Sequence, residues 1–139
     1  MIYSNLLIND KNWKHLTYSW FKKKLPHALL FHGPEGSGKE GHALELAALI
    51  QCSSKENNES CGICILCKQT KSLKNKNINL ILPLPRGKIR SRTDSIEKAF
   101  SKSTLQEYWD ILKEKEKNPY FSIKLKGANT ILINSIRTL

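Results

Sequence analysis

Apolar residues recur at helical spacing near the start of the chain. The stripe consists of Trp13, Leu16, Trp20 and Phe21. Spacings of three and four residues place such side chains on one face of a helix, and large aromatic residues on that face usually belong to a core. Asn9 or Asp10 can cap the helix, and Pro26 marks its end. The pattern therefore predicts a first helix whose tryptophans are buried.

Two short apolar runs, residues 28–31 and 78–82, are each followed within a few residues by glycine or proline. Their length and continuity predict buried strands. Between them, residues 39–51 return to helical spacing, with Leu44, Ala47 and Ala48 on one face. The small alanines would let this helix lie close to a sheet. Residues 130–133 are a further candidate for a short strand or an extended link.

Three polar residues in the second half of the chain are predicted to cap helices. Asp94 precedes a short apolar stretch, Ser103 a longer one, and Asn134 the last residues of the chain. The longest of these helices carries Leu105, Tyr108, Trp109 and Leu112 at helical spacing. Asn118-Pro119 is predicted to end it.

A glycine-rich turn lies between the first predicted strand and its helix. Residues 33–39 fit the pattern of Gly, four residues, Gly and Lys that cradles phosphate. Glycines let backbone N–H groups approach the oxygens, the next helix directs its N-terminus at them, and the lysine adds a charge. The candidate phosphate-binding residues are Gly33, Gly36, Ser37, Gly38, Lys39 and Glu40. Glu40 stands where Ser or Thr would hold magnesium. The alternative is a plain glycine-rich turn.

All four cysteines fall within residues 52–67. They are Cys52, Cys61, Cys64 and Cys67, separated by eight, two and two residues. A reducing cytosol disfavours a disulfide framework. Four thiolates fill a tetrahedral zinc site and leave no open position for water, so the spacing predicts structural Zn²⁺. An iron–sulfur cluster and four unligated thiols are the alternatives.

Charge and length narrow the possible classes of protein. The 139 residues allow one domain at most, and the net charge of +11 permits binding to nucleic acid or to an acidic partner. Lysine far outnumbers arginine, so a simple lysine-covered surface is an alternative. No apolar run is long enough to cross a membrane, and the N-terminus does not resemble a signal peptide. We therefore expect a cytoplasmic protein that does not bind membranes.

Taken in order, these motifs resemble subunits of the bacterial DNA polymerase III clamp loader. The resemblance rests on residues 25–31, the loop 33–39, the helix after it, and Cys52 with the Cys-x-x-Cys-x-x-Cys run. It covers roughly residues 13–83, and Ser135-Ile136-Arg137 resembles the start of the family's next helix. These subunits are AAA+ proteins with a zinc module after the phosphate-loop helix. The resemblance implies an α/β fold: the N-terminal part of a P-loop AAA+ domain over residues 1–139, with a small four-cysteine zinc module (52–67) and a helical insertion (86–127).

The resemblance also implies a function. The family's gamma/tau subunits keep Ser or Thr after the lysine and hydrolyse ATP, whereas delta prime subunits often have a degraded loop. Glu40 places this chain nearer delta prime: a non-hydrolysing subunit that helps load the sliding clamp onto primed DNA, with little or no binding of ATP and Mg²⁺. The implied partners are other clamp-loader subunits, the DNA polymerase III holoenzyme and primed DNA. An active gamma/tau-type ATPase and a zinc-bearing nucleic-acid-binding module remain alternatives.

Several family features have no counterpart in this sequence, among them the acidic strand, the Ser-Arg-Cys segment, the lid and the collar. The resemblance therefore implies an incomplete subunit. In AAA+ folds other strands lie between those formed here by residues 28–31 and 78–82. Since unpaired strands leave backbone groups unsatisfied, we expect the chain alone to be poorly stable.

Overall fold

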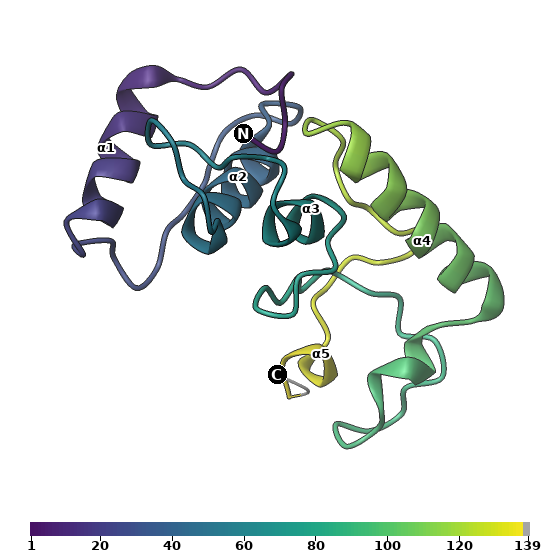
Figure 1. Cartoon of the computed structure of the whole chain (residues 1–139). Helices are drawn as coiled ribbons and strands as arrows, with labels where there is room; N and C mark the ends of the chain where they lie inside the picture. The colour runs from purple at the N-terminus through teal and green to yellow at the C-terminus, as the bar shows by residue number, and fades with distance from the viewer. Residues whose placement is uncertain (138–139) are drawn as a thin grey trace. The chain divides into compact units, whose positions relative to one another are not determined.

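The computed structural model describes residues 1–137, and these residues form helices but no strand. The helices are α1 (Asp10–Phe21), α2 (Lys39–Gln51), α3 (Ile65–Lys71), the 3-10 helix η1 (Ile96–Ala99), α4 (Lys102–Lys117) and α5 (Ile133–Arg137) (Figure 1). The chain divides into two compact units. Unit 1 holds residues 1–78 and 116–122, and unit 2 holds the remainder. None of these helices is both long enough and apolar enough to cross a bilayer.

Helix α2 is the centre of unit 1, because two apolar clusters cover different parts of its surface. The first cluster comprises Ile2, Tyr3, Leu6, Leu44, Ala48, Cys52 and Cys67. The second comprises Trp13, Leu46 and Leu49, with Leu16 and Trp20 packed against it. The predicted core position is therefore confirmed for Trp13, and Leu16 and Trp20 are half-buried beside it, whereas Phe21 is 47% exposed and does not belong to the core. The N-terminal segment and α1 thus pack on α2 through separate clusters.

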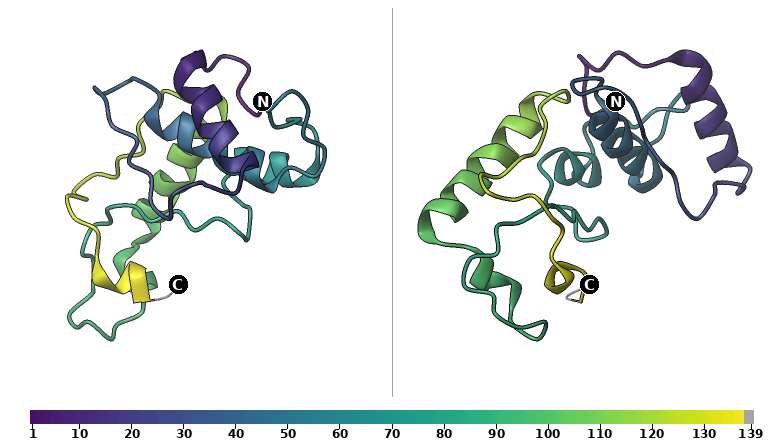
Figure 2. Two further views of the ribbon diagram at one scale, coloured as in Figure 1. Left: turned by 90° about the vertical axis from the view of Figure 1, so that its left-hand side faces the viewer. Right: turned by 180° about the vertical axis from the view of Figure 1, so that it is seen from behind.

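The sequence pattern predicted the start of α1 and both bounds of α2, but α1 ends at Phe21, several residues before the predicted end at Pro26. Asn9 is the N-cap of α1, and its side chain accepts a hydrogen bond from the N–H of Asn12 at 3.1 Å. Helix α2 covers residues 39–51 as predicted. Helix α3 was not predicted, because its seven residues begin within the cysteine run and show no helical stripe. Helices α2 and α3 are in contact and lie side by side in each view (Figures 1 and 2).

The predicted sheet is wrong for the part of the chain that the structure describes. Residues 28–31 and 78–82 are extended or irregular there and form no ladder. Residues 130–132 form the extended link that was one of the two expectations for 130–133, and residue 133 already begins α5. A strand needs a neighbour to pair its N–H and C=O groups, and the apolar pattern alone cannot supply one. Leu30, at the centre of the first run, is 86% exposed. Near the other two segments, the N–H of Leu84 donates to the carbonyl oxygen of Thr130 at 3.3 Å.

Unit 2 has a core of its own. Its buried residues are Leu84, Ile89, Ala99 and Leu125, with Ile96, Phe100, Tyr108, Ile111, Ala128 and Leu132 packed against them. The rings of Phe100 and Tyr108 meet edge to face with centroids 5.5 Å apart. Helix α4 therefore contributes to this core from one side, while Trp109 remains 45% exposed.

The helices of unit 2 exist, but their predicted caps are wrong by a few residues. Ser95, not Asp94, caps η1, and Ser101 accepts a hydrogen bond from the N–H of Thr104 in the first turn of α4. Asn134 lies within α5 and is buried there. Neighbouring serines and asparagines compete for such positions, and local sequence alone does not decide between them.

Candidate phosphate loop and metal centre

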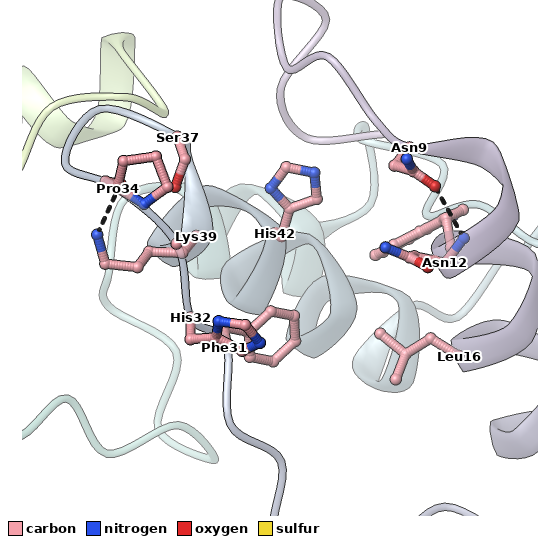
Figure 3. Close-up of a pocket in the computed structure, with 11 residues that line it drawn as sticks. Asn9, Asn12, Leu16, Phe31, His32, Pro34, Ser37, Lys39 and His42 are labelled. Carbon is pink, nitrogen blue, oxygen red and sulfur yellow. Dashed lines mark hydrogen bonds between the residues drawn. The ribbon is translucent and has the colours of Figure 1, made fainter.

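The glycine-rich turn leads directly into α2. Gly36 and Gly38 have φ of +77° and +74°, which L side chains rarely adopt. Gly38 is the N-cap of α2, and a Cβ on it would lie 2.9 Å from a ring carbon of Tyr120. The Nζ of Lys39 and the N–H of Ser37 both donate to the carbonyl oxygen of Pro34, each at 3.3 Å (Figure 3). The loop is therefore closed on itself, with Lys39 folded across it.

A pocket of about 310 Å³ opens beside this loop. It is lined by Asn9, Asn12, Trp13, Leu16, Phe31, His32, Gly33, Pro34, Ser37, Lys39 and His42. In Figure 3, His42 lies between the loop residues on one side and the two asparagines on the other. The Nδ1 of His42 lies 2.8 Å from the carbonyl oxygen of Gly38. The end of the pocket at the loop is thus basic because of Lys39. The end at α1 is lined by the side-chain amides of Asn9 and Asn12 and by apolar side chains.

One polar atom of this pocket wall has no partner among the described residues. The side chain of Trp13 is buried, and its Nε1–H meets no hydrogen-bond acceptor there. A buried donor without an acceptor costs free energy comparable to a lost hydrogen bond. This nitrogen is shielded from solvent, so the cost falls on the packing of α1 against α2.

Glu40 does not line the pocket. Burial, followed by the negative charges of Glu45, Glu116 and Glu40, raises the pKa of Tyr3 above its usual value. The charge of Glu40 is therefore felt in the core around Tyr3. The predicted phosphate-binding roles of Glu40 and the rest of the loop remain predictions.

The structure brings the four predicted metal ligands together. One sulfur from each of Cys52, Cys61, Cys64 and Cys67 lies within 4.8 Å of all the others, and the sulfurs of Cys61 and Cys67 are 4.0 Å apart. A tetrahedral zinc ion with Zn–S bonds of about 2.3 Å would hold its sulfurs roughly 3.8 Å apart. A small contraction would therefore make the cluster a closed zinc site.

Backbone N–H groups donate hydrogen bonds to sulfurs of the cluster, which favours the negatively charged thiolate form. The N–H groups of Cys61, Cys64 and Cys67 donate to the preceding sulfur of the cluster at 3.3, 3.4 and 3.5 Å. Burial acts to raise the pKa of Cys64, but hydrogen bonds from Cys67 and Ser53 outweigh it and lower that pKa to about 5. Burial and a hydrogen bond to Cys64 raise the pKa of Cys67 to about 12. Backbone hydrogen bonds from Cys64 and Ile63 also lower the pKa of Cys61. The cluster thus favours thiolate at Cys61 and Cys64 and thiol at Cys67 until a cation is bound.

A buried glutamate that the sequence analysis missed joins the N-terminal segment to the cysteine loop. The Glu45 carboxylate accepts hydrogen bonds from the N–H groups of Ile2 and Tyr3 and from the hydroxyl of Ser60. Ser60 directly precedes Cys61, and the terminal ammonium of Met1 donates to the Ser60 carbonyl oxygen. A charged residue inside an apolar helical stripe was the available signal.

Comparisons with known proteins match this chain to one protein family and to several relatives. The family model described as "DNA polymerase III, delta subunit" matches residues 8–136. The delta' subunit of Bacillus subtilis DNA polymerase III is 31% identical over 87 residues, 63% of this chain and 26% of the relative. The tau subunit from the same organism is 38% identical over 55 residues, 40% of this chain and 10% of the relative. Protein STICHEL-like 4 of Arabidopsis thaliana is 33% identical over 63 residues, 45% of this chain and 6% of the relative.

Because the family model covers most of the chain, the chain belongs to the DNA polymerase III delta subunit family. It resembles clamp-loader proteins, as the order of its motifs predicted. The chain spans about a quarter or less of the length of these curated relatives. No solved structure shows a significant match.

Proposed function

We propose that the chain is the N-terminal part of a delta prime-type clamp-loader subunit that does not hydrolyse ATP. The observation that carries this proposal is the residue after the phosphate-loop lysine. Glu40 occupies the position where a hydroxyl would hold magnesium, in a chain that belongs to the delta subunit family. Membership of the family and the similarity to delta' and tau subunits support a role in loading the sliding clamp during DNA replication.

The proposed partners are other clamp-loader subunits and, through them, the DNA polymerase III holoenzyme and primed DNA. The loop beside the pocket retains its glycines and Lys39. These features support binding of an anion more than they support catalysis. Phosphoryl transfer depends on positioning and on charge neutralisation by a metal, and carboxylate replaces the expected hydroxyl here.

We further propose that Cys52, Cys61, Cys64 and Cys67 hold Zn²⁺. The closeness of the four sulfurs supports this assignment. Bound zinc would supply a crosslink between the end of α2, the loop 53–60 and the start of α3. Cys64 is also the N-cap of α3, so its position fixes the start of that helix.

An active gamma/tau-type ATPase is the second candidate, favoured by the 38% identity to the tau subunit and by the retained Lys39. The test is to purify the chain alone and with a tau-type subunit and a sliding clamp from the same source. Delta prime-type function predicts a stable complex and no ATP turnover by the chain alone. Turnover by the chain alone that disappears in Lys39→Ala would support the ATPase instead. Failure to join any clamp-loader complex would overturn the proposal.

A further inference from the structure

All arginines of the chain gather at one place in unit 2. They are Arg86, Arg90, Arg92 and Arg137, whereas the other basic residues are lysines spread over the whole sequence. The guanidinium of Arg137, in α5, donates to the carbonyl oxygen of Arg92 at 3.3 Å. We call residues 86–95 together with Arg137 the arginine loop; residues 86–95 lie in the teal-to-green stretch of chain that precedes α4 (Figure 1).

The backbone of the arginine loop is anchored to the core of unit 2. Ile89 is buried in that core, and the N–H of Lys88 donates to the carbonyl oxygen of Lys98 at 2.8 Å. Gly87 has a φ of +51°, and a Cβ on it would lie 2.6 Å from the carbonyl oxygen of Ala99. The loop therefore packs directly against η1 at this glycine.

The side chains of Asp94 and Asn134 form hydrogen bonds to the backbone of the arginine loop. The Oδ2 of Asp94 accepts hydrogen bonds from the N–H groups of Arg90 and Ser91 at 2.7 and 2.9 Å. The buried Asn134 side chain donates to the carbonyl oxygens of Ser91 and Asp94 at 3.1 and 2.8 Å. Asp94 also pairs with Lys98. The acidic residue of the loop is therefore used to hold its backbone and a neighbouring lysine.

The basic residues of the loop are each exposed to solvent. The exposed residues are Arg86, Lys88, Arg90, Arg92 and Arg137. Within residues 1–137, none of these five side chains forms an ion pair with an acidic residue. An ordered loop thus presents five cationic groups whose charge is not neutralised locally.

We propose that the arginine loop binds the phosphate backbone of nucleic acid. The fork of a guanidinium matches a phosphate group bidentately, which explains why arginine rather than lysine gathers here. Residues 86–95 contain no aromatic side chain on which a base could stack, so binding is independent of base sequence. The inference goes beyond the proposed function, because it depends only on the charges and geometry of this loop.

The test measures binding of the full chain to a fluorescently labelled duplex DNA of mixed sequence by anisotropy, over a series of salt concentrations. The test variant is Arg86→Gln/Arg90→Gln/Arg92→Gln. The matched control is Lys22→Gln/Lys23→Gln/Lys24→Gln, which removes the same charge from exposed residues just after α1. We expect the arginine variant to lose about tenfold or more in affinity at low salt. The slope of log K against log salt should fall by roughly 2 to 3. The lysine variant should change both quantities little.

A third variant, Arg86→Lys/Arg90→Lys/Arg92→Lys, keeps the positive charge. It shows whether the glutamine variant loses affinity because of its lost charge or because it fails to fold. It should retain more binding than the glutamine variant, and circular dichroism should show the same helix content in all variants. Equal losses in the arginine and lysine variants would overturn the proposal, because binding would then depend on diffuse charge. Stronger binding to polyglutamate than to DNA would also overturn it, in favour of an acidic protein partner.

Discussion

Both oxygens of the buried Glu45 carboxylate lie within hydrogen-bonding distance of the N–H of Ile2, at 3.1 and 3.0 Å. The same carboxylate accepts from the N–H of Tyr3 at 3.2 Å and from the hydroxyl of Ser60 at 2.6 Å. A single side chain of α2 thus holds the first residues of the chain beside the loop that carries Cys61. The N-terminal segment is therefore part of the structure that surrounds the four-cysteine cluster.

Glu45→Gln should destabilise the protein by about 2 kcal/mol or more, because an amide places N–H groups opposite some of the donors that the carboxylate now satisfies. Thermal or urea unfolding followed by circular dichroism measures the change. Glu56→Gln, at an exposed position of the polar loop, is the control and should be nearly neutral. Equal stability of the two variants would show that Glu45 does not hold the N-terminal segment in solution.

Leu30→Lys should improve solubility without lowering stability. Leu30 is 86% exposed and stands beside Leu29, which is 39% exposed, so the pair forms an apolar segment without a strand partner in the described chain. Such segments promote association through their unpaired backbone. Light scattering as a function of protein concentration tests this prediction. Leu49→Lys is the contrast: Leu49 is fully buried, and a charge there should prevent folding.

The sequence predicted where helices and motifs lie better than it predicted which other segments pack against them or pair with them. The stripe of Trp13, Leu16 and Trp20 is sufficient to define α1, because helix formation and burial depend on spacings within one short segment. Residues 28–31 have an equally apolar pattern, but a strand forms only when another segment pairs with it. The pattern could not show that no such partner is present in residues 1–137.

The candidate site, too, could be predicted from local spacing but not from contacts between distant residues. The spacing of the cysteines predicted that four sulfurs would meet, and the structure places them within 4.8 Å of one another. The roles of Glu45 and Trp13 depend on contacts between distant residues, Ile2 and Ser60 for the first and the pocket wall for the second. Such contacts leave no local pattern in the sequence.

Purified without chelator, the protein should contain one zinc ion per chain, and Cys64→Ser should bind it more weakly. Removal of one thiolate leaves an incomplete tetrahedral site. Metal analysis together with competition by a colorimetric chelator measures content and affinity. Ser54→Ala, at an exposed position of the loop between Cys52 and Cys61, is the control. A metal-free native protein, or unchanged zinc affinity in Cys64→Ser, would contradict the assignment.

In the metal-free protein, Cys64 should be alkylated faster than Cys67 at neutral pH. The pKa of Cys64 is lowered to about 5, so this residue is a thiolate at pH 7, whereas the pKa of Cys67 is raised to about 12. The thiolate is the reactive form, so the rate at Cys64 should fall as the pH drops through about 5. Peptide mapping after timed alkylation measures both rates. Bound zinc should protect both residues, and equal rates in the metal-free protein would contradict the predicted difference.

The last prediction concerns nucleotide. We expect no measurable ATP hydrolysis and weak or absent Mg–ATP binding by the unaltered chain, because Glu40 replaces the hydroxyl that would hold magnesium. Glu40→Thr should strengthen Mg–ATP binding in calorimetry, and Lys39→Ala in that background should abolish the gain. Micromolar Mg–ATP binding by the unaltered chain, with turnover that is lost in Lys39→Ala, would instead make the chain an active ATPase of the gamma/tau type.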